Sequence, residues 1–218
     1  MAAQKLLVTG FGPFPGVRRN PSADVARLVA ADGRWGRLGV QTQALVLPTT
    51  YAALNGQLAP ALLRGFDAVL MIGVAGRSRR LRVERRAVNR ASILFPDASG
   101  CRSESLGFGE AVDVRRTRAS APQALAALRS AGLPSRLSQD AGRYLCNAAY
   151  LRALAEPVPV LFVHIPKGRR PDRPRHPARP DPAVRLPQIA AALARIAVDL
   201  LRQSRQGGVE TLIRPERA

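Results

Sequence analysis

DAVLMIGVAG, residues 67–76, is a continuous apolar run that ends in glycine. A run without polar alternation is typical of a central strand that is buried on both faces of a parallel sheet. KLLVT at 5–9 and VPVLFVHIP at 158–166 have the same character. Amphipathic helical patterns separate these runs. We therefore predict an α/β fold with an open, twisted, mostly parallel sheet and helices on both faces, in three layers.

The other predicted elements follow from periodicity and from capping residues. Asn20 before Pro21 suits the N-cap of a helix over 21–31. Residues 97–120 lack a clear period and are expected to form loops. The chain of 218 residues is long enough for one domain, 1–218. The remaining predicted strands span 40–48, 80–88 and 135–138, and the remaining helices span 50–64 (interrupted by Pro60), 122–131, 140–155 and 184–204.

The net charge of +19 raises the question of nucleic-acid binding. Lys5 and Lys167 are the only lysines, and the arginines occur in almost every segment, as a bias in composition would produce. The densest basic stretch, within the basic proline-rich loop at 167–183, contains no aromatic side chain for base stacking. We therefore expect no specific nucleic-acid binding.

The chain shows no apolar segment of membrane-spanning length and no charged-then-apolar leader. A cytoplasmic protein with no membrane partner is the expectation. The two cysteines are far apart, which fits a reducing compartment. Neither has a partner at metal-ligand spacing, so we expect no metal site and no cofactor.

Cys146 is the stronger candidate for a nucleophile. It lies near the start of the predicted 140–155 helix, where the helix dipole favours a thiolate. The alternative is a buried structural cysteine. Cys101 lies in a polar loop sequence and is interpreted as an incidental surface thiol.

His164 is the candidate general base, because it ends an apolar strand at the sheet edge where α/β sites form. The alternative is a packed core histidine. His176, in the basic proline-rich loop, is expected to be solvated. A cysteine–histidine pair usually has a third group that orients the imidazole. Glu84 is a candidate for it, and the residues alone leave Asp97 and Asp140 open.

The glycine-rich loop TGFGPFPG at 9–16 follows a strand but does not match a phosphate-binding loop. Its two prolines remove backbone N–H donors. Its two aromatic residues, Phe11 and Phe14, are expected to be exposed and to wall a pocket for a small, flat, apolar ligand.

Four segments in register resemble the pyroglutamyl peptidase I (pyrrolidone-carboxylate peptidase) family of cysteine peptidases. They are TGFGPFPGVRRNPS at 9–22, RVERRAVN at 82–89 with PD at 96–97, DAGRYLCNAAY at 140–150 and VLFVHIP at 160–166. The resemblance implies an open α/β/α sheet, hydrolysis of the amide bond after an N-terminal pyroglutamyl residue, no metal, and a homo-oligomer. The implied substrate is a peptide or small amide with an N-terminal pyroglutamate.

The resemblance also implies roles for individual residues. Cys146, His164 and Glu84 fall on the family's catalytic positions. Phe11, Phe14 and Tyr144 fall on positions that surround the lactam ring.

Two departures from the family pattern concern specificity: Pro15 replaces a glycine, and Leu94 replaces an arginine thought to lie by the reacting centre. They leave open a related cysteine amidohydrolase with altered acyl specificity. A non-enzymatic, arginine-rich binding protein on the same fold is the second alternative, and it would not need the three catalytic positions.

Overall fold

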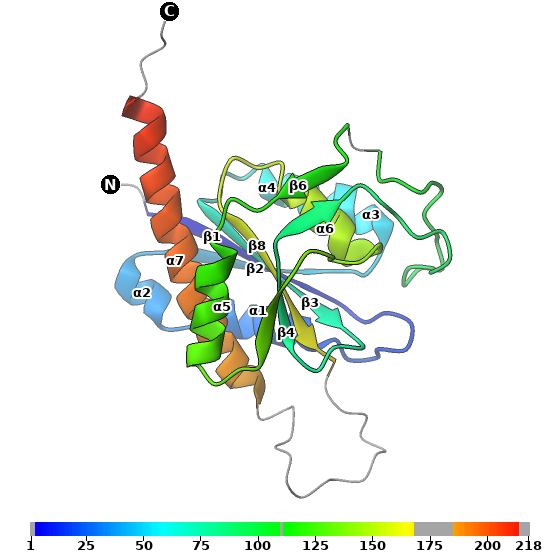
Figure 1. The fold of residues 1–218 in the computed structure, drawn as a ribbon, viewed down its shortest axis with the longest axis horizontal. Coiled ribbons are helices and arrows are strands. Elements are labelled where there is room, and N and C mark those ends of the chain that lie inside the picture. Colours follow the sequence, from blue (N-terminus) through cyan, green and yellow to red (C-terminus); the bar gives the residue numbers. More distant parts are fainter. Residues whose placement is uncertain (1–2, 110, 168–184, 214–218) are drawn as a thin grey trace, which may run out of the picture.

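The computed structural model describes residues 3–109, 111–167 and 185–213, without the side chains of residues 185 and 207–213. A six-stranded sheet with the order β2-β1-β3-β8-β4-β7 forms its centre (Figure 1). The first four strands are mutually parallel, β4 is antiparallel to β8, and β7 is parallel to β4. This confirms a mostly parallel α/β sheet. The strands are β1 (Lys5–Phe11), β2 (Gln41–Leu47), β3 (Ala68–Ala75), β4 (Leu81–Glu84), β7 (Ser135–Ser138) and β8 (Val160–Pro166).

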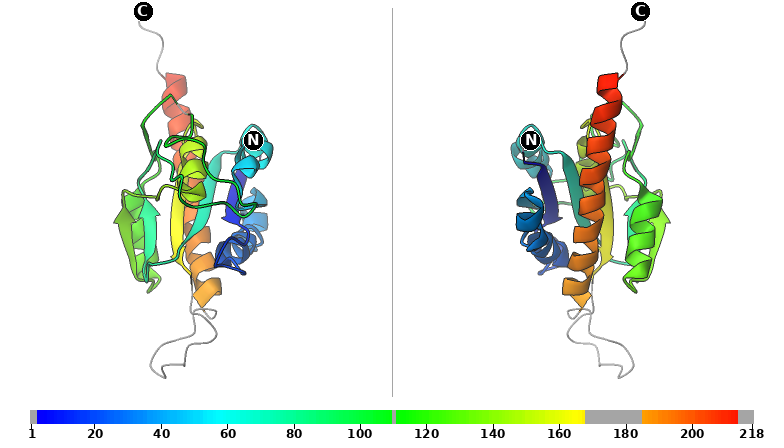
Figure 2. Two further views of the ribbon diagram at one scale, coloured as in Figure 1. Left: turned by 90° about the vertical axis from the view of Figure 1, so that its right-hand side faces the viewer. Right: turned by 90° about the vertical axis from the view of Figure 1, so that its left-hand side faces the viewer.

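Helices cover both faces of the sheet, as predicted, and the two views of Figure 2 show the opposite faces. A core formed with α1 (Pro21–Ala30), α2 (Arg34–Leu38), α5 (Ala121–Ser130) and α7 (Arg185–Ile213) lies on one face. A second core lies on the other face, under a second group of helices. That group consists of α3 (Tyr51–Ala53), the π-helical turn η1 (Leu54–Leu58), α4 (Ala59–Leu62) and α6 (Leu145–Ala153).

The apolar run at 67–76 becomes β3, which lies between β1 and β8 with its residues 68–73 buried. The predicted strand at 80–88 divides at Arg85, whose N–H donates to the carbonyl of Ser138 at 2.8 Å. The second part, β5 (Arg86–Val88), leaves the main sheet and pairs with β6 (Val114–Arg116), which was not predicted. The short helix α2 was not predicted either.

The predicted helix at 140–155 begins later, at Leu145. Gly142 has a φ of 89° and donates its N–H to the Asp140 carboxylate at 3.0 Å. This local turn uses the residues that would otherwise have formed the first helical turn. As a result, Cys146 is the second residue of α6.

The N-terminus of α1 is fastened to the end of β1. The Asn20 side chain accepts from Ser22 N at 3.1 Å, as an N-cap does, and donates to the Gly12 carbonyl at 2.8 Å. A Cβ on Gly10 would lie 2.5 Å from the Ser22 carbonyl oxygen, so this close approach needs glycine. These contacts fix the loop after β1 against the sheet edge.

Residues 168–183 of the basic proline-rich loop at 167–183, His176 among them, lie outside the described residues, so the expectations for them stay predictions. None of the described helices combines the length and apolar character needed to span a bilayer.

Candidate active site

Three residues form a row across neighbouring strands. Gly73 on β3 pairs with His164 on β8, which pairs with Arg82 on β4. Directly paired residues point to the same face of a sheet. This face is the one covered by α6, because Phe162 lies two residues before His164 and belongs to the core beneath that helix.

The start of α6 places Cys146 over this row. A Cβ on Gly73 would lie 2.9 Å from the Cys146 sulfur and 2.7 Å from the Phe162 ring, so the absence of a side chain at Gly73 makes room for the sulfur. Asn147 anchors the helix start, because its side chain accepts from Val88 N at 2.9 Å and donates to the Val88 carbonyl at 2.7 Å.

Glu84 is the acidic residue that contacts His164, with Oε1 2.9 Å from Nδ1. Both side chains are buried, so Glu84 does not form a surface ion pair. Asp140 bonds to Gly142 within its own turn, and Asp97 bonds within a different loop. The geometry therefore separates Glu84 from the two alternatives that the residues alone left open.

Arg82 approaches the same carboxylate oxygen, with Nε 3.1 Å from Glu84 Oε1. Its guanidinium also donates to Ser138 Oγ at 2.8 Å and to the Asp140 carbonyl. The buried Glu84 charge is thus balanced by a cation, as a buried charge requires. Arg82 and His164 share one oxygen of Glu84, which fixes the carboxylate relative to the imidazole.

Desolvation and, to a smaller extent, the Glu84 charge raise the pKa of the Cys146 thiol to about 12, against the opposing effect of the backbone N–H groups of Val74 and Cys146. The helix dipole favours the thiolate, but the effect of desolvation on the pKa is larger and opposite in the free protein. The thiol is neutral near pH 7 and needs a base to remove its proton. In the described part of the chain no hydrogen bond joins the sulfur to His164, and such contacts often tighten only when substrate binds.

Phe11 is not exposed as expected: its side chain is buried, and its ring packs against that of Phe162 with centroids 6.4 Å apart. Phe14 is half-buried and is bridged to Val17 by two backbone hydrogen bonds. Pro15 and Gly16 form the corner of this turn. Gly16 has a φ of 77°, as a type II turn requires after proline, so Pro15 fits the backbone here.

Tyr144 precedes α6 and ties the loop at 93–97 to the site. Its hydroxyl donates to the Pro96 carbonyl at 2.8 Å, and its ring meets Tyr51 edge-on. Desolvation raises the pKa of Tyr144 to about 12, so it remains a donor at neutral pH. Leu94 in the same loop is 71% exposed. Cys101 is also exposed, as expected for an incidental thiol.

Asp97 organises this loop from a buried position. It accepts from Tyr51 N at 2.9 Å, Ser99 N at 2.8 Å and Cys101 N at 3.0 Å. Burial acts to raise the pKa of Asp97, but the bonds from Ser99, Tyr51 and Cys101 lower it below the ordinary 3.8.

We expect Asp97→Ala to lower the free energy of unfolding by about 1.5–3 kcal/mol at pH 7, the range for hydrogen bonds to a charged group. Because the folded-state pKa is depressed, this stabilisation is fully present above pH 3.8 and is lost as the pH falls through the folded-state pKa. Urea unfolding of both proteins between pH 7 and pH 2.5 measures it. A difference that stays constant over that range would show that the charge of Asp97 is not the cause.

Sequence reasoning missed Gly73, Arg82 and Asn147. Arg82 could have been found, because it lies two residues before Glu84 and a strand places both side chains on one face. Asn147 adjoins Cys146, but no sequence pattern indicates its hydrogen bonds to β5.

Among the described residues, no three His, Cys, Asp or Glu side chains gather as metal ligands do. A thiol at a helix start beside a histidine–glutamate pair, on an open α/β/α sheet, defines the class of α/β cysteine hydrolases.

Comparison with known proteins narrows this class to one family. A family model for pyroglutamyl peptidase matches residues 4–197. The chain belongs to the pyroglutamyl peptidase family of cysteine peptidases.

Individual relatives agree with this assignment. A pyrrolidone-carboxylate peptidase of Levilactobacillus brevis is 34% identical over 171 residues, covering 74% of this chain and 81% of that protein. One of Thermococcus kodakarensis is 31% identical over 182 residues, covering 78% and 86%. The crystal structure of pyrrolidone carboxyl peptidase from Thermus thermophilus has a TM-score of 0.70 at 32% identity, covering 91% of this chain and 99% of the other.

Proposed function

We propose that this protein hydrolyses the amide bond after an N-terminal pyroglutamyl residue, with Cys146 as nucleophile, His164 as general base and Glu84 as the residue that orients the imidazole. One observation carries the proposal. Glu84 contacts His164 at 2.9 Å in a buried position, and the Cys146 sulfur lies over the strand row that contains His164. A binding protein has no use for a thiol, an imidazole and a carboxylate in this arrangement.

The reaction begins with the neutral thiol. His164 takes the proton of Cys146 as the sulfur attacks the pyroglutamyl carbonyl, so a C–S bond forms and a tetrahedral oxyanion results. Glu84 holds Nδ1–H, which leaves Nε2 free to accept the proton. His164 then gives the proton to the leaving amine as the C–N bond breaks. Water, deprotonated by His164, cleaves the thioester and releases pyroglutamate.

Backbone N–H groups support the oxyanion in this proposal. Those of Val74 and Cys146 face the sulfur closely enough to lower the pKa of its thiol in opposition to burial. We propose that the same two groups donate to the oxygen that develops beside the sulfur.

The acyl side of the substrate lies toward β1 in this proposal. The half-buried Phe14 and Tyr144 line it, and the buried Phe11 supports it from the core through Phe162.

We also propose that the protein forms a homo-oligomer in the cytoplasm and binds no specific nucleic acid. Exposed apolar side chains in the loop after β5 support an interface: Ile93, Leu94, Phe95 and Leu106.

Hydrolysis of pyroglutamyl p-nitroanilide tests the function directly. The same assay with prolyl p-nitroanilide, which keeps the ring but lacks its carbonyl, tests recognition of the lactam. Release of nitroaniline from the first compound and little from the second is the expected result. Equal turnover of both, or turnover of neither by folded protein, would contradict the proposal.

Leu94 gives a prediction about rate. If an oxyanion donor is missing at this loop position, Leu94→Arg should raise kcat on pyroglutamyl p-nitroanilide, up to about the hundredfold that one such donor contributes. Leu94 is exposed, so the variant should fold normally. Leu94→Gln is the matched polar control without a guanidinium. If the pocket is instead reshaped for another acyl group, the arginine should lower turnover by placing a charge on an apolar wall.

A further inference from the structure

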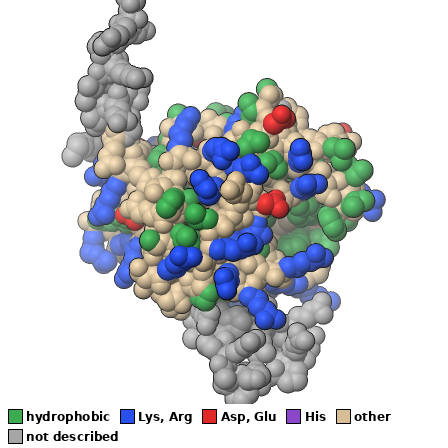
Figure 3. Space-filling model, in the orientation of Figure 1, with side chains coloured by type: hydrophobic (Ala, Val, Ile, Leu, Met, Phe, Trp, Pro, Cys, Tyr) green, Lys and Arg blue, Asp and Glu red, His purple; other side chains and the backbone are tan. Residues whose placement is uncertain are grey.

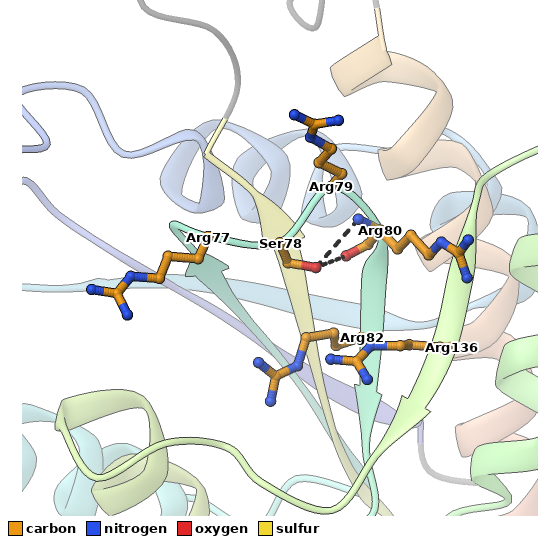
Figure 4. A pocket seen from close by; sticks show the side chains of 6 residues that line it. All are labelled: Arg77, Ser78, Arg79, Arg80, Arg82 and Arg136. Atoms are coloured by element: carbon orange, nitrogen blue, oxygen red, sulfur yellow. Dashed lines mark hydrogen bonds between the residues drawn. The ribbon is translucent and has the colours of Figure 1, made fainter.

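A cavity of about 330 Å³ lies next to the site and is lined by Arg77, Ser78, Arg79, Arg80, Arg82 and Arg136, here called the arginine pocket (Figure 4). It lies where the turn after β3 meets β4 and β7. Figure 4 shows Arg136 reaching from β7 toward β4, and Arg82 reaching from β4 toward β8. Arg77, Arg79 and Arg80 point away from one another, whereas Arg82 and Arg136 lie side by side, so these two are the cations best placed to share one ligand.

Most of the charge in this pocket is unbalanced. Arg82 is paired with Glu84, but in the described part of the chain Arg77, Arg79, Arg80 and Arg136 make no ion pair. No carboxylate lines the cavity. Arginine side chains are scattered over the molecular surface as well, as Figure 3 shows for one face. Positive charge alone therefore does not distinguish the arginine pocket from the rest of the surface. Its position next to the candidate active site does.

That position follows from strand register. The row that contains Gly73, His164 and Arg82 continues to Arg136, the partner of Arg82 on β7. In the other direction it reaches Phe11, because Thr9 pairs with Met71 and both parallel strands run two residues further. The row therefore runs from Phe11 through Gly73, beneath the Cys146 sulfur, to His164, and from there to Arg82 and Arg136.

This order fixes the direction of a bound peptide. If the acyl group lies on the Phe11 side of Cys146, the leaving amine lies on the other side, beside the histidine that protonates it. Beyond His164 the row offers Arg82 and Arg136. Strands lie about 4.8 Å apart, so Arg136 is about 10 Å from His164, which an extended peptide covers in about three residues.

We propose that the arginine pocket binds acidic side chains of the leaving peptide, and that the protein prefers pyroglutamyl peptides with Asp or Glu at the second and third residues after the scissile bond. The inference rests on the proposed function and names a substrate class for it. Guanidinium groups bind carboxylates through paired hydrogen bonds, and cations near a site also attract anionic substrates.

The test compares three peptides that differ only at two positions: pyroglutamyl-Ala-Glu-Glu-Gly amide and its Gln-Gln and Lys-Lys counterparts. Exposed ion pairs are individually weak, so we expect kcat/KM for the Glu-Glu peptide to exceed that for Gln-Gln by about five- to tenfold at low salt. The Lys-Lys peptide should be the poorest substrate. Screening should shrink the ratio at about 0.5 M NaCl.

The variant Arg136→Gln should bring the Glu-Glu to Gln-Gln ratio close to one. Arg82 is left in place because it contacts Glu84. Arg129→Gln, which removes one exposed arginine from α5 on the opposite face, should keep the ratio. Inorganic phosphate should inhibit cleavage of the Glu-Glu peptide more than that of the Gln-Gln peptide.

Equal kcat/KM for all three peptides would overturn this inference while leaving the proposed function intact. Failure to cleave any pyroglutamyl compound would remove the proposed function itself. Tight oligonucleotide binding at physiological salt that needs Arg136, with no peptide preference, would assign the pocket to nucleic acid and overturn the inference as well.

Discussion

Replacing Cys146 by serine is expected to lower kcat on pyroglutamyl p-nitroanilide by at least about ten-thousandfold, as removal of a catalytic nucleophile does. Serine fits the same space at the start of α6, so the helix and its Asn147 anchor should persist. The hydroxyl fails because it is a far weaker nucleophile than sulfur in a site arranged for a thiol.

Cys101→Ser is the matched control. It changes the second thiol of the chain, which is exposed in the loop after Asp97. Its kcat and KM should equal those of the wild type. Iodoacetamide should inactivate the wild type and Cys101→Ser alike, through Cys146. Substantial activity in Cys146→Ser, or loss of activity in Cys101→Ser, would refute the assignment of the nucleophile.

The second large effect is expected for Glu84→Gln, which should lower kcat by about a hundred- to ten-thousandfold with little change in KM. Glutamine preserves the shape of the side chain but removes the negative charge that faces His164 Nδ1 and Arg82 Nε. An amide nitrogen placed toward the imidazole would favour the wrong tautomer. The Arg82 cation would then be left without its buried counter-charge.

A control separates this role from general destabilisation. Glu104→Gln removes one carboxylate from an exposed loop position and should leave kcat unchanged. Circular dichroism and the urea midpoint identify any loss of folded Glu84→Gln protein. If the folded variant retains wild-type kcat, Glu84 does not orient the base.

The strands that hold the site were predictable because they are buried on both faces, and burial leaves a continuous apolar run in the sequence. The run at 67–76 becomes β3, and that at 158–166 becomes β8, with His164 in place to meet Gly73 and Arg82. The position of Cys146 near a helix start was also predictable, although the Gly142 turn moved that start to Leu145.

Other features depend on contacts between distant segments. Burial of Phe11 depends on Phe162 across the sheet, and the high pKa of Cys146 depends on desolvation and on Glu84. No local sequence pattern indicates the burial of Phe11 or the raised pKa of Cys146. Likewise, β5 leaves the main sheet to pair with β6, which joins residues 86–88 to residues 114–116.

The acyl-enzyme tests the central claim most directly. A pyroglutamyl ester with a good leaving group should make hydrolysis of the thioester rate-limiting, so that rapid acid quenching traps the intermediate. Digestion and mass spectrometry should then place one pyroglutamyl group on the peptide that contains Cys146, and none on the peptide that contains Cys101. Turnover of the ester with no label on Cys146, or with the label on another residue, would contradict the account.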